Sequence, residues 1–195
     1  MGLSVALPAS EVRQYRQALR DVNTLAQGAL LSQWRQFDLA DAAAVTAGLL
    51  DTLPGLVDGY FVVSSTVAAD WYDVVRAQAG ARRRFAAIPA EPPDRSRAEV
   101  LARWAVGPLF SADPKPDIAL SKLAGGLQRV VATGARETVR VSSVADPAAR
   151  GWQRVTSGGS CDFCTMLAGR GAVYSEASVA FESHDACHCD AVPAF

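Results

Sequence analysis

Residues 151–195 read GWQRVTSGGSCDFCTMLAGRGAVYSEASVAFESHDACHCDAVPAF, and this stretch contains every cysteine and histidine of the protein. A C-x-x-C pair, Cys161 and Cys164, precedes a C-x-C pair, Cys187 and Cys189. Thiols clustered at such spacings are typical of a metal site. We therefore expect a small metal-dependent module at this end of the chain.

The residue types predict that the metal is zinc and that it is structural. Two cysteines separated by two residues can both reach one ion at about 2.3 Å. In an extended segment Cys187 and Cys189 point to one face, whereas His188 points to the other. Five candidates compete for four tetrahedral positions: Cys161, Cys164, His184, Cys187 and Cys189. Two other interpretations remain open, namely reduced cysteines in a small core, or two disulfides formed in an oxidising compartment.

The composition is that of a soluble globular chain. Of its 195 residues, 50% are hydrophobic and 20% are charged, and the formal net charge is −1. A dedicated nucleic-acid binder draws its affinity from neutralised phosphates, so this balance argues against that class. The start, MGLSVALPAS, lacks the basic region of a secretion signal. No stretch approaches the roughly 20 apolar residues of a membrane span, and we expect synthesis in the cytoplasm.

Apolar residues at helical spacing predict three helices in the first part of the chain. The expected helices span residues 10–36, 41–53 and 56–80. Ser10 and Asp41 are the expected N-caps, and Pro54 with Gly55 is expected to end the second helix. The third helix carries a regular apolar stripe: Leu56, Tyr60, Val63, Val67, Trp71, Val74 and Ala77. We expect the helices to bury one shared face and to form a rod.

The segment ARRRFAAIPAEPPDR, residues 81–95, predicts a loop or linker, because proline at this density cannot continue a helix. Its arginine triplet, Arg82 to Arg84, fits a solvated helix end better than a contact with DNA or with an acidic partner.

Two further helices are expected after this loop. Ser96 and Glu99 have the spacing of a capping box, and Gly107 with Pro108 closes the short helix behind them. A longer helical pattern covers about 118–141. It is expected to bend or break at its glycines, which are Gly125, Gly126 and Gly134.

Asp146 and Pro147 mark the expected boundary between a helical region, residues 1–145, and a C-terminal Cys/His module, residues 146–195. Within the module we expect a strand at 152–156, a glycine turn at 157–160, one or two helical turns at 161–168, and extended pieces at 172–175 and 189–195. The predicted fold class is mostly α, an elongated helical N-terminal region with a small C-terminal α+β zinc-ribbon-like module. A module this small buries too little apolar core to be stable by itself, and a bound metal would stabilise it.

The run DPAARGWQRVTSGGSCDFCTMLAGRGAVYS, residues 146–175, and HDACHC, residues 184–189, resemble the C-terminal region of the Mu F-like minor head proteins of tailed bacteriophages. The minor capsid proteins of actinobacterial phages are the most similar. The resemblance implies a virion structural protein, made in the host cytoplasm and acting in head assembly. It implies that the protein lies near the portal vertex or the packaged DNA, with the portal and other head proteins as partners and several copies in a virion. It also implies a metal-binding or fold-stabilising role for Cys161, Cys164, His184, Cys187 and Cys189.

Relatives of this kind are often labelled capsid maturation proteases, and that activity is the main alternative. Ser160, His184 and Asp185 are candidates for a serine triad, and Cys161 or Cys164 for a cysteine nucleophile. The histidines are, however, embedded in the cysteine cluster, and no G-x-S-x-G sequence is present. We therefore expect no enzyme activity.

Two weaker interpretations remain. A zinc hydrolase would use Glu182 or Asp185 as its base, but neither lies in an H-E-x-x-H sequence. A small DNA-binding zinc module would use Arg150, Arg154 and Arg170 together with the arginine triplet.

Overall fold

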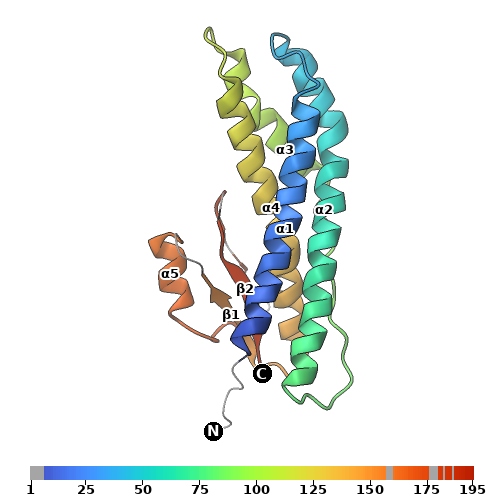
Figure 1. Ribbon diagram of the computed structural model, residues 1–195, viewed down its shortest axis with the longest axis vertical. Coiled ribbons are helices and arrows are strands. Elements are labelled where there is room, and N and C mark those ends of the chain that lie inside the picture. Colours follow the sequence, from blue (N-terminus) through green and yellow to red (C-terminus); the bar gives the residue numbers. More distant parts are fainter. Residues whose placement is uncertain (1–6, 157–159, 176–179, 182, 186) are drawn as a thin grey trace.

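Three long helices run side by side along the length of the molecule (Figure 1). They are α1 (Ala9–Trp34), α2 (Ala42–Gln78) and α4 (Pro116–Ala145). The shorter α3 (Ser96–Ala105) and the 3-10 helix η1 (Gly107–Phe110) connect α2 to α4. This computed structural model describes residues 7–156, 160–175, 180–181, 183–185 and 187–195. Within that part of the chain, no helix is both long enough and apolar enough to cross a membrane.

The C-terminal piece is a two-stranded antiparallel sheet with one short helix. Strand β1 (Gly151–Val155) pairs with β2 (Asp190–Ala194), so that Gly151 lies opposite Ala194. Helix α5 (Asp162–Ala168) lies between them in sequence, and the expected extended piece at 172–175 forms a bridge from Tyr174 to Trp152. The predicted fold class, mostly helical with a small α+β module, is confirmed. The expected glycine turn includes residues 157–159, which lie outside the described residues.

Two apolar cores follow each other along the bundle. The first is formed by α1, α2, α3, α4 and the η1 turn, without residues of the module. The second combines the other halves of α1, α2 and α4 with module residues, among them Trp152, Phe181 and Phe195. The strands therefore pack directly on the helices, and Figure 1 shows the module against the lower half of the bundle. The division into two domains at residue 145 stays a prediction.

Pro54 lies inside α2, so the prediction of two helices separated at Pro54 is wrong. A proline has no N–H to donate to the carbonyl four residues earlier, which is the usual reason for a break. Here that carbonyl, Leu50 O, accepts a hydrogen bond from the Arg95 guanidinium at 3.2 Å. Because a side chain outside the helix satisfies the freed acceptor, α2 continues past the proline.

Two of the three predicted caps are also wrong. Neither Ser10 nor Ser96 caps a helix, because α1 begins one residue earlier and α3 begins at Ser96 itself. The N-cap residue of α3 is Arg95, and the Asp94 carboxylate before it accepts from the Ser96 N–H at 2.8 Å. Asp41 does cap α2, accepting from the Ala44 N–H at 2.9 Å.

The buried face of α2 is wider than the predicted stripe and includes only part of it. Val63 and Val74 are 46% and 47% exposed. Leu56 and Trp71 of the stripe are buried as expected, and the neighbouring residues Val57, Phe61, Ala68, Tyr72 and Val75 are buried as well. Helices α1, α3 and α4 all pack on α2, so a wide face is covered and the apolar spacing alone does not locate its centre.

Helix α4 is continuous through its glycines, contrary to the expected break. The glycines allow close helix packing instead. A Cβ placed on Gly126 would collide with Leu101 of α3, and one placed on Gly134 would lie 2.7 Å from the backbone oxygen of Phe61 in α2. The helix propensity lost at these positions is offset by the contact that they permit.

The segment between α2 and α3 lies along the bundle. The backbone N–H groups of Ile88 and Ala90 each donate to a hydroxyl of α4, on Ser142 and Thr138 respectively, at 2.9 Å. The arginine triplet within this segment is exposed.

Asp146 joins the end of α4 to the module. It is 2% exposed, and its carboxylate accepts from the Arg76 guanidinium at 2.7 and 3.2 Å and from the Tyr72 hydroxyl at 3.3 Å. One of its oxygens also accepts from the Ala148 N–H at 2.9 Å. The turn that leads into β1 is thereby fixed on α2.

We predict that Gly134→Ala lowers the free energy of unfolding by about 1–3 kcal/mol, because the new methyl group meets backbone that cannot rotate away. Gly28→Ala is the matched control. Gly28 is exposed within α1 with open space around it, so the same change should raise stability by about 0.5–1 kcal/mol. Urea denaturation followed by circular dichroism measures both. Equal effects of the two substitutions would contradict the close approach of α4 to α2.

Candidate metal centre

Two short pieces of the module bring the cysteines together. Cys161 is the N-cap residue of α5, and its sulfur accepts from the Cys164 N–H at 3.5 Å. Cys187 and Cys189 lead into β2. Cys161 is exposed, whereas Cys164, Cys187 and Cys189 are buried. The sheet pairing of β1 with β2 thus places the second cysteine pair beside the first turn of α5.

The ligand atoms form two groups of three that share Cys164. In the buried group, the Cys164 sulfur lies 3.7 Å from that of Cys187 and 3.3 Å from that of Cys189. In the more exposed group Cys161 and Cys164 are joined by His184, whose Nε2 lies 3.3 Å from the Cys161 sulfur. Each of the other four candidate ligands therefore lies within 4.8 Å of Cys164, in two groups that meet at this residue.

These distances fit a thiolate metal site better than disulfides. Sulfurs that share a tetrahedral zinc at about 2.3 Å lie roughly 3.8 Å apart, whereas a disulfide is about 2.05 Å long. The separation of Cys164 from Cys187 agrees with the first value, and all four cysteines are free thiols. Cys187 and Cys189, at 2.7 Å, are closer than two ligands of one ion would be. An ion that uses both would spread them by about 1 Å.

The surroundings push the thiol pKa values apart. The pKa of Cys161 falls to about 7, because the Cys164 N–H and then His184 stabilise its thiolate. The pKa of Cys187 is lowered chiefly by a hydrogen bond from Cys189, while the pKa of Cys189 is raised by the same contact and by burial. A thiolate is the form that binds metal, so the surroundings favour that form at Cys161 and Cys187, whereas burial raises the pKa of Cys164, and the Cys187 contact with burial raises that of Cys189.

Arg154 of β1 contributes a positive charge next to the sulfurs. Its Nη1 lies 3.0 Å from the Cys189 sulfur and 3.7 Å from the Cys164 sulfur, and its guanidinium stacks 3.8 Å from the Phe181 ring centroid. The sequence makes Arg154 a candidate DNA contact. It is 3% exposed, so it is not on a surface that meets phosphates.

Arg136 of α4 is the residue that sequence reasoning missed. It is 1% exposed and donates to the carbonyls of Cys189 and Cys187 at 2.9 and 3.1 Å and to the Ser183 hydroxyl at 3.0 Å. The signal for it was available, because Arg136 lies between the buried Ala132 and Val139 at helical spacing. It holds the segment that carries three of the five candidate ligands.

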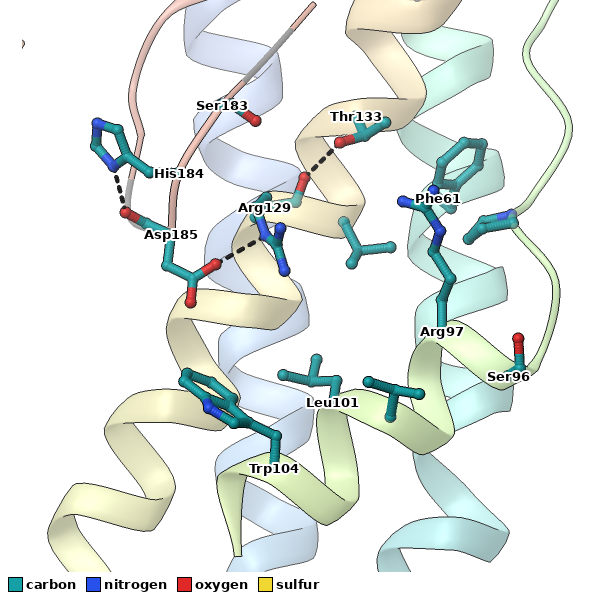
Figure 2. A pocket seen from close by; sticks show the side chains of 13 residues that line it. Phe61, Ser96, Arg97, Leu101, Trp104, Arg129, Thr133, Ser183, His184 and Asp185 are labelled. Carbon is teal, nitrogen blue, oxygen red and sulfur yellow. Dashed lines mark hydrogen bonds and ion pairs between the residues drawn. The ribbon is translucent and has the colours of Figure 1, made fainter. Parts of the chain in front are cut away.

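The two histidines have different roles. His188 lies outside both ligand groups, and its Nδ1 is 3.3 Å from the Gln128 amide nitrogen of α4. The His184 Nδ1 is 2.7 Å from the backbone oxygen of Asp185, while the Asp185 carboxylate pairs with Arg129 at 2.7 Å (Figure 2). The Asp185 carboxylate, which would orient His184 in a serine triad, thus pairs with α4 instead. Glu182, the other candidate base, lies outside the described residues.

We predict that Arg136→Leu lowers the free energy of unfolding by about 3–5 kcal/mol, because it leaves two buried carbonyls without a donor. Arg129→Leu is the matched control. It removes the same charge from the same helix, but its pair with Asp185 is 46% and 36% exposed, and its loss should cost less than about 1 kcal/mol. Thermal denaturation of the two variants measures the difference. Similar melting temperatures would contradict the role of Arg136.

Comparison with known proteins identifies the family of the chain. No curated protein and no solved structure is significantly similar to the chain. The family model described as VG15 protein matches residues 7–195, which include every helix, both strands and the whole cysteine cluster. A match over almost the entire length shows membership, so the chain belongs to the VG15 protein family and is a viral protein of the phage type.

Proposed function

We propose that this protein is a minor capsid protein of a tailed bacteriophage, with a structural zinc site in its C-terminal module. Membership of a viral protein family supports the phage assignment. The likeness of residues 146–195 to the Mu F-like minor head proteins supports the finer role in head assembly, near the portal vertex or the packaged DNA. The portal and other head proteins are the proposed partners.

The observation that carries the zinc proposal is the convergence of five candidate ligands on Cys164. Cys161, Cys164, His184, Cys187 and Cys189 form the ligand pool for four positions. A bound ion would cross-link α5 to the segment before β2, and such a link stabilises a module with little core of its own. Arg154 would add an N–H donor to the ligand sulfurs and offset their negative charge.

We propose a structural role and no enzyme activity, because three of the sulfurs are buried. A closed set of thiolate ligands leaves no open position for a substrate. One contact favours the alternative of a thiol protease: Cys161 is exposed, has a lowered pKa and lies 3.3 Å from His184 Nε2. A nucleophile and base are arranged in this way in cysteine enzymes. Metal content distinguishes the structural zinc site from the thiol protease, because metal ligation would occupy both Cys161 and His184.

We expect the purified protein to contain about one zinc per chain, with its thiols protected from alkylation until a chelator is added. Elemental mass spectrometry and a thiol count measure this. Cys161→Ser should lose the metal and melt the module while most helical circular dichroism remains, and Cys161 is exposed, so the change disturbs no core packing. A metal-free protein with four reactive thiols would contradict the proposal and favour Cys161 as a nucleophile.

The two histidines provide a matched control for the same measurement. His184→Gln should weaken metal binding, because His184 belongs to a ligand group. His188→Gln should leave the metal content unchanged. If both variants retain full metal content, the ligands are the four cysteines alone.

The role in the particle is tested separately. Purified virions of the parent phage should contain the chain in far fewer copies than the major capsid protein, as measured by quantitative mass spectrometry. Its absence from virions would contradict the minor capsid assignment without affecting the zinc site. For a DNA-binding role, a gel shift at low salt that disappears as salt is raised would be needed.

A further inference from the structure

A cleft of about 660 Å³ opens between α3, α4 and the segment 183–185 (Figure 2). Phe61 of α2 and Leu101 of α3 contribute buried apolar atoms to its wall. Arg97 rises from α3 at one side, and Trp104 lies at the opposite end of the same helix. The metal proposal leaves this cleft without a role.

The cleft exposes large apolar side chains. Val100 is 66% exposed and Trp104 is 48% exposed, and both line the cleft. The opposite face of α3 is fully packed on the bundle. Apolar groups of this size, gathered in a concave surface, are typical of a site that another molecule covers.

The charges of the cleft are unbalanced in favour of cations. The Arg129 guanidinium is already paired with the Asp185 carboxylate at 2.7 Å. Arg97 is exposed, and no acidic side chain pairs with it within the described part of the chain. The Lys122 ammonium lies 4.4 Å from the Trp104 ring centroid and adds a further cation beside the cleft. A ligand that covers the apolar wall is therefore complementary if it carries a carboxylate near Arg97.

We propose that this cleft is a docking site for an apolar segment of a partner protein that bears acidic side chains. Its apolar side chains cover Val100 and Trp104, and one of its carboxylates pairs with Arg97. A nucleic acid fits less well, because the lining is largely apolar and includes the Asp185 carboxylate. The proposal concerns residues of α3 and goes beyond the capsid assignment and the metal site.

Trp104 provides a direct measure of occupancy. The other tryptophans, Trp34, Trp71 and Trp152, are 5%, 8% and 1% exposed, so iodide in solution quenches Trp104 selectively. The probe is a synthetic amphipathic peptide with leucine at helical spacing and glutamate on its flank. We expect it to protect Trp104 from iodide. The same peptide with lysine in place of every glutamate should bind about fivefold more weakly or worse.

Two pairs of variants test the contacts through the anisotropy of a labelled glutamate peptide. Trp104→Ala should weaken binding on the order of tenfold or more, whereas Phe110→Ala, at an exposed aromatic residue outside the cleft lining, should have no effect. Arg97→Gln should weaken binding about fivefold, whereas Arg82→Gln, at an exposed arginine outside the lining, should not. Circular dichroism and metal content should be unchanged in all four variants, which separates this test from that of the zinc site.

Several results would overturn the proposal. They are a lack of Trp104 protection by the glutamate peptide, equal binding of the lysine peptide, and equal effects of a variant and its control. Protection of Trp104 by an oligonucleotide instead of the peptide would assign the cleft to nucleic acid. A change in sedimentation of the protein alone on Trp104→Ala would assign it to a second copy of the chain.

Discussion

The buried guanidinium of Arg136 is the constraint on which the arrangement of the C-terminal module depends. Its three nitrogens all donate to the segment between residues 183 and 189, and two of the acceptors are the carbonyls of Cys187 and Cys189. Backbone carbonyls in a short irregular segment have no sheet or helix partner of their own, and burying them unpaired is costly. One side chain from α4 supplies these donors. The position of the ligand-bearing segment is thus determined by the helix bundle as well as by the sheet.

The proposed metal and two arginines would have complementary effects at this site. Arg136 holds the backbone behind the cysteines, and Arg154 places a positive charge 3.0 Å from the Cys189 sulfur. A buried cation is expensive unless it is paired, and the thiolates that an ion requires are equally expensive without a counter-charge. Each therefore lowers the cost of burying the other. On α1, Arg16 adds a third link through Asp190 at 2.9 Å and the carbonyl of Thr156 at 2.9 Å.

The sequence predicted features that depend on local spacing. The strand at 151–155, the helical turns after Cys161 and the gathering of five candidate ligands follow from residue types and short intervals. Errors arose where a distant residue decides the outcome. Pro54 does not end α2, because the Arg95 guanidinium donates a hydrogen bond to the Leu50 carbonyl. Gly126 and Gly134 do not break α4, because α3 and α2 pack against them. Arg136 was missed because an arginine on a helix is usually solvated, although its spacing from Ala132 and Val139 places it on the buried face of α4.

His184 connects the two sites described above. Its Nε2 lies 3.3 Å from the Cys161 sulfur, and the same residue lines the cleft together with Asp185. Asp185, the residue after His184, pairs with Arg129 of α4. Ser183, the residue before His184, accepts a hydrogen bond from Arg136 of α4, so the segment 183–185 is held at both of its ends. Ligation of His184 would restrict its ring further, because the Nδ1 contact with the Asp185 backbone already selects its orientation. One wall of the cleft is therefore built from residues that are positioned by Arg129, Arg136 and the contact of His184 with Cys161. A docking surface of this kind needs a rigid wall, since every side chain that must be ordered on binding reduces the affinity.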